Sequence, residues 1–321
     1  MTVLGDLKAL FEASLTPTPA VLTIGLLIVL LAPILLHFIL SATTPYTTLP
    51  SVVLVGPSGA GKTALLTLFE RGPLSSSSSS AVKPSAAATH TSQTPSSVEL
   101  SVSANATSSF RDDLDATGSA AKKFLLVDTP GHAKLRRHAL SRLTASGTKH
   151  ANGSIAGSGT AAPPSTLAKL KAVVFMVDAA ALADGDALPS TAEYLYEVLL
   201  ALQKRVAGGK KAAPVPVLVA ANKLDLFTAL PAALVKSNLE MELGRIRKTR
   251  SKGLLDSGVG ADDLAAGEET DDWLGEYGSD KFTFKQMLEF DVEVDVIGGN
   301  VVGEGEGPGA DKWWRWIAEK I

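Results

Sequence analysis

The sequence contains no cysteine and no excess of basic residues. Its 321 residues include 30 Lys and Arg against 33 Asp and Glu, which gives a formal net charge of −3. The absence of cysteine excludes disulfides and thiolate metal sites. The balanced charge excludes a global basic field, so we expect no direct binding to nucleic acid.

Charged residues are also absent from the longest apolar segment, residues 20–40. At about 1.5 Å per residue, a helix of this length just spans a hydrocarbon core about 30 Å thick, so we predict one transmembrane helix. A cleaved signal peptide is disfavoured, because the preceding residues are not basic and no small-residue cleavage site follows. A buried core helix is the remaining alternative.

A glycine-rich motif follows a short apolar run at residues 52–55 and precedes a segment of helix-forming composition. Residues 56–63 fit G-x-x-x-x-G-K-T, and strand, glycine loop and helix is the context that a phosphate-binding loop requires. Backbone N–H groups and the helix N-terminus would contact phosphate oxygens, Lys62 would reach the β- and γ-phosphates, and Thr63 would ligate Mg²⁺. The predicted nucleotide-binding residues here are Gly56, Ser58, Gly59, Ala60, Gly61, Lys62 and Thr63.

A second phosphate-side element follows the apolar run at residues 124–127. That run ends in Asp128, and Gly131 stands three residues later. In P-loop GTPases an aspartate here holds Mg²⁺ through a water, and the glycine N–H senses the γ-phosphate. We therefore predict these roles for Asp128 and Gly131. An ordinary Asp-Pro-Gly turn is the alternative.

A base-recognition motif follows a third apolar run, residues 215–221. Asn222, Lys223 and Asp225 fit N-K-x-D. The Asp225 carboxylate can accept hydrogen bonds from guanine N1–H and the 2-amino group, a pair that adenine lacks, and an unpaired carboxylate would disfavour ATP. Asn222 is expected to brace the loop, and the stem of Lys223 to pack over the base. The sequence therefore predicts GTP with Mg²⁺.

The remaining patterns complete an α/β order of elements after a linker at residues 41–50. Further strands are predicted at 98–102, 172–178 and 290–296, and further helices at 133–143, 190–206, 231–248 and 310–321. In the last helix Trp313, Trp316, Ile317 and Ile321 fall on one face, which indicates packing. Low-complexity insertions near 74–97, 103–121 and 146–165 and an acidic excursion near 253–280 interrupt the domain at 51–321.

The orientation of the predicted anchor cannot be taken from flanking charge. No Lys or Arg occurs between Lys8 and Lys62, so the positive-inside rule has nothing to act on. Because abundant GTP and ATP are cytosolic, the nucleotide motifs put residues 51–321 in the cytosol and residues 1–19 on the other side.

The three ordered motifs resemble those of small Ras/Arf-type GTPases, a P-loop NTPase fold with a mostly parallel sheet flanked by helices. Together with residues 20–40 and the run D-T-P-G-H-A-K-L-R at 128–136, the chain resembles the family of signal recognition particle receptor beta subunits. The resemblance implies a single-pass endoplasmic reticulum protein with a lumenal N-terminus that binds GTP and recruits the receptor alpha subunit. It also implies co-translational targeting, with the ribosome and translocon as indirect contacts.

The resemblance implies slow or partner-dependent hydrolysis, because His132 stands where Ras-type enzymes place the water-orienting glutamine. His132 either positions water or only packs beside the switch. Thr91 best matches the threonine that the first switch supplies to Mg²⁺. Residues 297–300 occupy the place of the loop that contacts guanine O6. A membrane-anchored Arf/Sar-like GTPase of vesicle trafficking is the alternative function, and a kinase is disfavoured by N-K-x-D.

Overall fold

The computed structural model describes residues 19–43, 49–71, 89–102, 122–144, 169–207, 214–256, 273–275, 281–302 and 309–321. It divides into two units, residues 1–47 and 48–321. In the first unit the predicted helix is present as α2, Pro19–Thr43, with Pro33 inside it. Within the residues described, no helix is both long and apolar enough to cross a membrane.

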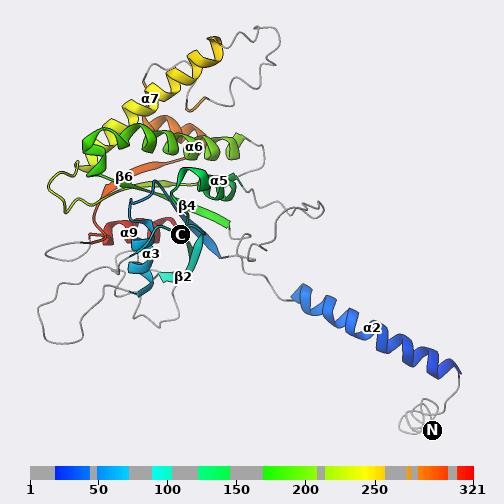
Figure 1. Ribbon diagram of the computed structural model, residues 1–321. Helices are drawn as coiled ribbons and strands as arrows, with labels where there is room; N and C mark the ends of the chain where they lie inside the picture. Colours follow the sequence, from blue (N-terminus) through cyan, green and yellow to red (C-terminus); the bar gives the residue numbers. More distant parts are fainter. Residues whose placement is uncertain are drawn as a thin grey trace, which may run out of the picture. The chain divides into compact units, whose positions relative to one another are not determined.

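The second unit is built on a six-stranded sheet in the order β2-β3-β1-β4-β5-β6 (Figure 1). Its strands are β1 (Pro50–Val55), β2 (Ser96–Val102), β3 (Lys122–Asp128), β4 (Lys169–Asp178), β5 (Val217–Asn222) and β6 (Val294–Gly298). Only β2 is antiparallel to its neighbour, β3; the other pairs are parallel. The carboxyl ends of five parallel strands therefore lie along one edge, where all three sequence motifs begin.

Helices cover both faces of the sheet. The α-helices are α3 (Lys62–Arg71), α5 (Arg136–Thr144), α6 (Ala187–Ala207), α7 (Ala232–Asp256) and α9 (Asp311–Lys320), and short 3₁₀ helices are η1 (Ala133–Leu135), η3 (Ala181–Asp184) and η4 (Phe284–Phe290). In Figure 1, α6 and α7 lie on one side of the sheet and α3 and α9 on the other. Strand β1 serves both faces, because Val53 and Val55 join one buried cluster while Val52 and Leu54 join the other. Such near-continuous apolar runs are typical of parallel strands buried on both sides.

Helix α9 fixes the end of the domain to the edge strand β6. Trp313 and Trp316, predicted as packing residues, are buried, and their indole N–H groups donate to Ile297 O at 3.0 Å and to Asp295 Oδ2 at 2.8 Å. Trp314 is equally buried, with its ring 4.9 Å from that of Phe69 in an edge-on arrangement. The prediction therefore included too few packing residues of α9, because it left out Trp314.

Several predicted boundaries were wrong. The alternating pattern at 290–296 is strand only from Val294, because residues 284–290 form η4 and Asp291 has a left-handed backbone with φ of 54°. Helix α7 continues to Asp256, inside the predicted acidic excursion, and β2 begins at Ser96, inside the first predicted insertion. The segment predicted as one helix at 133–143 is divided into η1 and α5. The predicted insertions at 103–121 and 146–165 lie outside the described residues.

Candidate nucleotide site

The glycine motif forms a tight loop between β1 and α3. Gly56, Gly59 and Gly61 have φ of 139°, 81° and 97°, a region in which L side chains are strained. An added Cβ on Gly56 would also lie 2.2 Å from the Met176 carbonyl oxygen. The loop therefore needs glycine both for its turns and for its close approach to β4.

Lys62 lies inside this loop. Its Nζ donates to the carbonyl oxygens of Gly56 at 2.9 Å and Pro57 at 2.8 Å, and the residue is only 5% exposed. Burial lowers the pKa of Lys62 to about 8, and the nearby charge of Asp128 opposes this shift. A partly desolvated cation in a ring of backbone groups is suited to bind a polyanion.

Asp128 lies beside this cation at the end of β3 and is fully buried. Thr63 Oγ1 donates to Asp128 Oδ2 at 2.6 Å, whereas Asp128 Oδ1 is buried without a hydrogen-bond partner among the described residues. Burial raises the pKa of Asp128, and the Thr63 hydroxyl and the Lys62 charge oppose that rise. A carboxylate with a free buried oxygen next to a threonine hydroxyl is an oxygen donor set that fits Mg²⁺.

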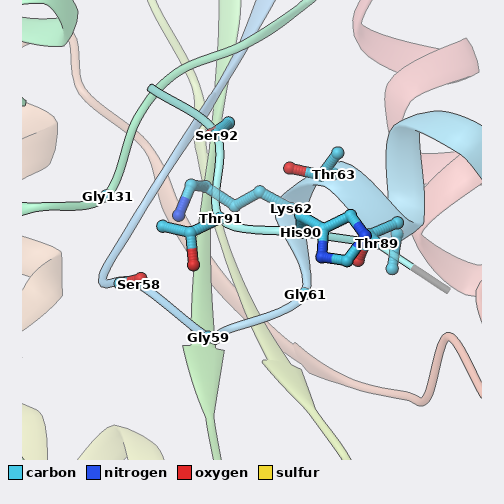
Figure 2. Close-up of a pocket in the computed structure, with 11 residues that line it drawn as sticks. Ser58, Gly59, Gly61, Lys62, Thr63, Thr89, His90, Thr91, Ser92 and Gly131 are labelled. Atoms are coloured by element: carbon cyan, nitrogen blue, oxygen red, sulfur yellow. The ribbon is translucent and has the colours of Figure 1, made fainter. Parts of the chain in front are cut away.

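Lys62 and Thr63 line a cavity of about 260 Å³. It is lined by three segments that are distant in sequence: the glycine loop with the start of α3, residues 89–92, and Gly131 (Figure 2). Gly131 packs so closely that an added Cβ would lie 2.6 Å from Lys62 Nζ, from Pro57 C and from Ser58 N. The structure therefore brings Thr91 and Gly131, both predicted switch residues, to the same space as Lys62 and Thr63.

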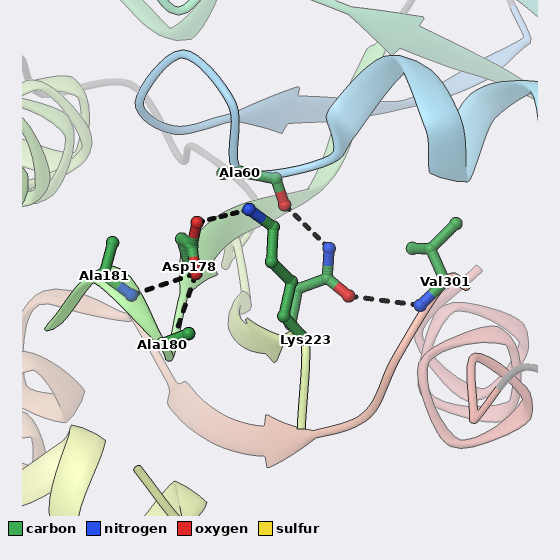
Figure 3. A network of polar contacts seen from close by, with 7 residues as sticks. Ala60, Asp178, Ala180, Ala181, Lys223 and Val301 are labelled. Atoms are coloured by element: carbon green, nitrogen blue, oxygen red, sulfur yellow. Dashed lines mark hydrogen bonds and ion pairs between the residues drawn. The ribbon is translucent and has the colours of Figure 1, made fainter. Parts of the chain in front are cut away.

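The N-K-x-D loop is joined to the glycine loop through Asn222. This residue is buried, and its Nδ2 donates to Ala60 O at 2.8 Å while its Oδ1 accepts from Val301 N at 3.1 Å (Figure 3). The bracing role predicted for Asn222 thus has a definite geometry. Lys223 has a left-handed backbone with φ of 67°, and Asp225 is exposed.

His132 does not line the cavity. It is exposed, and its Nδ1 accepts from Lys134 N at 3.3 Å, which caps the start of η1. The geometry gives His132 a capping contact, and its neighbour Gly131 lines the cavity.

The comparisons with known proteins agree with this geometry. A family model described as the signal recognition particle receptor beta subunit matches residues 47–151 and 164–292. The chain belongs to this family. The resemblance drawn from the motifs is thereby confirmed.

Individual relatives of this receptor beta subunit family cover most of the chain. The Saccharomyces cerevisiae signal recognition particle receptor subunit beta is 28% identical over 85% of this chain and 84% of its own length. The solved Chaetomium thermophilum receptor SRb-GTP/SRX complex is 49% identical, covers 85% of this chain and 100% of that one, and has a TM-score of 0.65. The SRb-GDP-Mg structure from the same organism is 48% identical with a TM-score of 0.58, covering 87% of this chain and 100% of that one. The predicted small-GTPase fold, a mostly parallel sheet with flanking helices, is therefore confirmed.

Two features of this family member were not anticipated from its sequence. Asp178, at the end of β4, forms an ion pair with Lys223. Arg136, the last residue of the D-T-P-G-H-A-K-L-R run, lies over the ring of Tyr194 at 4.4 Å and so joins the start of α5 to α6. The available signal for Asp178 was its position, since it ends a buried strand as Asp128 and Asn222 do.

The loop after β6 lies against the N-K-x-D loop. Leu224 N donates to Gly299 O at 3.3 Å, and Gly299 N donates to Ala221 O at 2.9 Å. Residues 297–300 are thus beside the predicted base-recognition residues, where their assignment as the loop near guanine O6 requires them. That assignment stays a prediction.

Replacing Asn222 with alanine should destabilise the nucleotide-free protein by at least about 2 kcal/mol. The change leaves Ala60 O and Val301 N without a partner in a buried place, and each such group costs about 1–3 kcal/mol. Urea unfolding followed by circular dichroism measures the loss. Asn238→Ala, on α7, is the control, and equal stability of the two variants would contradict the bracing role.

Proposed function

We propose that the chain is the GTP-binding, membrane-anchored subunit of the signal recognition particle receptor. It binds GTP with Mg²⁺ and in that state recruits the receptor alpha subunit to the endoplasmic reticulum for co-translational protein targeting. The observation that carries the proposal is the single cavity shared by the glycine loop, residues 89–92 and Gly131. The names of the relatives support it, since one solved relative is an SRb-GTP/SRX complex and another is SRb-GDP-Mg.

Each motif has one task in this proposal. The loop of Gly56, Ser58, Gly59, Ala60 and Gly61 and the Lys62 ammonium hold the phosphates, and Asn222, Lys223 and Asp225 hold guanine. Thr63, Thr91 and, through a water, Asp128 hold Mg²⁺. The metal neutralises phosphate charge. The buried free oxygen of Asp128 supports this donor set.

Nucleotide-dependent recruitment follows from the position of the two switch segments. The γ-phosphate and Mg²⁺ would hold Thr91 and Gly131 against the glycine loop and so order one surface for the alpha subunit. Hydrolysis is slow or partner-dependent in this proposal. His132, whose ring caps η1, would need to turn toward the cavity to position water.

The membrane part of the proposal concerns residues 20–40, which lie within α2. They would form a single span with residues 1–19 in the lumen and the GTPase domain in the cytosol. The chain would contact the ribosome and translocon only indirectly, through the assembled receptor, and would not bind nucleic acid itself.

The test is a pull-down with the full chain from detergent-solubilised membranes, loaded with GTPγS or GDP in parallel. Selective recovery of the alpha subunit with GTPγS is the expected result. Coat or tethering proteins in its place would favour the alternative, an Arf/Sar-like trafficking GTPase. Equal recovery with both nucleotides would exclude the switch.

Gly131→Ala should abolish the nucleotide dependence of this recovery. Its Cβ would meet Lys62 Nζ, Pro57 C and Ser58 N at 2.6 Å, so the segment could no longer close on the glycine loop. We expect GTPγS affinity to fall roughly tenfold or more while GDP affinity changes little, because GDP makes no demand on the closed position. Gly244→Ala, whose Cβ would have ordinary 3.6 Å contacts, is the control. Unchanged GTPγS-dependent recovery would refute this role.

A further inference from the structure

Asp178, the last residue of β4, is bound to the N-K-x-D loop by a contact that the motif itself does not require. One carboxylate oxygen, Oδ2, pairs with Lys223 Nζ (Figure 3). The other, Oδ1, accepts from Ala180 N and Ala181 N, both at 3.1 Å. The two oxygens thus have separate tasks: one holds its own turn and the other holds the lysine.

Backbone hydrogen bonds connect the same two segments. Ala179 N donates to Asn222 O at 3.0 Å, and Leu230 N donates to Ala179 O at 3.1 Å. Ala179, the residue after Asp178, is therefore hydrogen-bonded to residues that precede and follow Lys223 in the sequence. The distance of Asp178 from the N-K-x-D loop is set by the backbone and not by the ion pair alone.

Lys223 is consequently held at both ends. Its backbone is in the left-handed region, with φ of 67°, and its carbonyl accepts from Leu226 N at 3.1 Å. Its ammonium is held by Asp178. A four-carbon side chain fixed at both ends loses most of its alternative rotamers. Nucleotide binding therefore does not have to immobilise it, and the entropy cost of binding is lower.

We propose that Asp178 is a positioning residue for the base, orienting the stem of Lys223 over guanine. The inference rests on the proposed function, since it assumes a guanine nucleotide in this site. Stabilisation of the fold is a weak alternative role, because the Lys223 and Asp178 side chains are 37% and 19% exposed and partly exposed ion pairs contribute little. If the ion pair preorganises Lys223, its loss should change nucleotide affinity rather than the stability of the fold.

Asp178→Asn separates the two roles of the carboxylate. An asparagine Oδ1 still accepts from Ala180 N and Ala181 N, while the charge that holds Lys223 is lost. We expect fluorescent GDP to dissociate roughly tenfold faster from this variant, which corresponds to about 1.4 kcal/mol. Lys223→Met should show at least the same acceleration, and the double variant should be no faster than Lys223→Met alone.

A competition assay distinguishes positioning of the base from general damage. Pyrophosphate occupies only the phosphate half of the site, so its affinity should be the same for Asp178→Asn and the unaltered protein. Glu293→Gln is the matched control, because it removes another ion pair, with Lys320, at the amino end of β6. This control should release GDP at the unaltered rate.

The outcomes separate this inference from the proposed function. If the unaltered protein retains no guanine nucleotide, the proposed function fails. If it retains GDP, and Lys223→Met accelerates release while Asp178→Asn does not, only the positioning role of Asp178 is overturned. Additive effects in the double variant, or an equal loss of pyrophosphate affinity, would overturn it as well.

Discussion

Replacing Lys62 with methionine should weaken GTP binding by at least about a hundredfold while leaving the fold intact. The residue is 5% exposed, and its ammonium lies against the glycine loop, whose backbone N–H groups would surround the phosphates. Charge-assisted hydrogen bonds contribute about 1.5–3 kcal/mol each, and Lys62 would make them to two phosphates. Titration with a fluorescent GTP analogue measures the loss. Lys285→Met, an exposed lysine of η4, is the control.

The same variant should be at least as stable as the unaltered protein when no nucleotide is bound. Burial lowers the pKa of Lys62 from 10.5 to about 8, so folding disfavours its charged form at neutral pH, by about 3 kcal/mol at most. Hydrogen bonds from Nζ to Gly56 O and Pro57 O, which methionine cannot make, offset part of that gain. A large loss of stability on this substitution would contradict the argument.

Stability of the nucleotide-free protein should therefore depend on pH through Lys62. Between about pH 8 and 10.5 the unfolded lysine holds its proton and the folded one has released it. Unfolding then takes up a proton, so the stabilising free energy rises with pH across this window and the penalty is fully present below pH 8. Urea unfolding at several pH values should show this rise in the unaltered protein and a flatter profile in Lys62→Met.

The sequence predicted those parts of the candidate site that depend on short motifs. The binding roles predicted for Gly56, Lys62 and Thr63 follow from their spacing, because few other sites combine a strand, a glycine loop and a helix in this order. Asp128 and Asn222 were identified by their place at the ends of buried strands, and parallel strands bring such ends to one edge of the sheet. These predictions needed no long-range information beyond the order of the motifs.

Pairings across long stretches of chain could not be predicted in this way. The hydrogen bond from Asn222 to Ala60 joins residues 162 positions apart, and the ion pair of Lys223 with Asp178 depends on the register of β4 against β5. The predicted start of β6 was wrong for a related reason. Alternation of apolar and polar residues continues through 290–296, but η4 extends to Phe290, Asp291 is left-handed, and the register of β6 with β5 starts at Val294. Alternation of apolar and polar residues indicates a strand but does not predict the residue at which its pairing with a neighbouring strand begins.

Asp225→Asn should reverse the base preference of the site from guanine to xanthine. A carboxylate accepts from both N1–H and the 2-amino group of guanine, whereas an asparagine amide offers one acceptor and one donor. Xanthine presents N1–H together with a carbonyl oxygen at position 2, so it matches the amide. Sites that hydrogen-bond a substrate group can reject a mismatched analogue by about 10⁴-fold or more, and for the exposed Asp225 we expect roughly a hundredfold in each direction.

Competition between GTP and XTP for the same fluorescent nucleotide measures this reversal. Asp186→Asn, an exposed aspartate between η3 and α6, is the control and should keep the guanine preference. Because Asp225 would contact the base through its side chain alone, we expect the fold and the pyrophosphate affinity to be unchanged. Loss of both nucleotides would mean that Asp225 supports the loop and does not contact the base. Unaltered GTP affinity would place the base elsewhere, and the guanine assignment would then have to rest on residues 297–300, whose backbone lies beside Leu224.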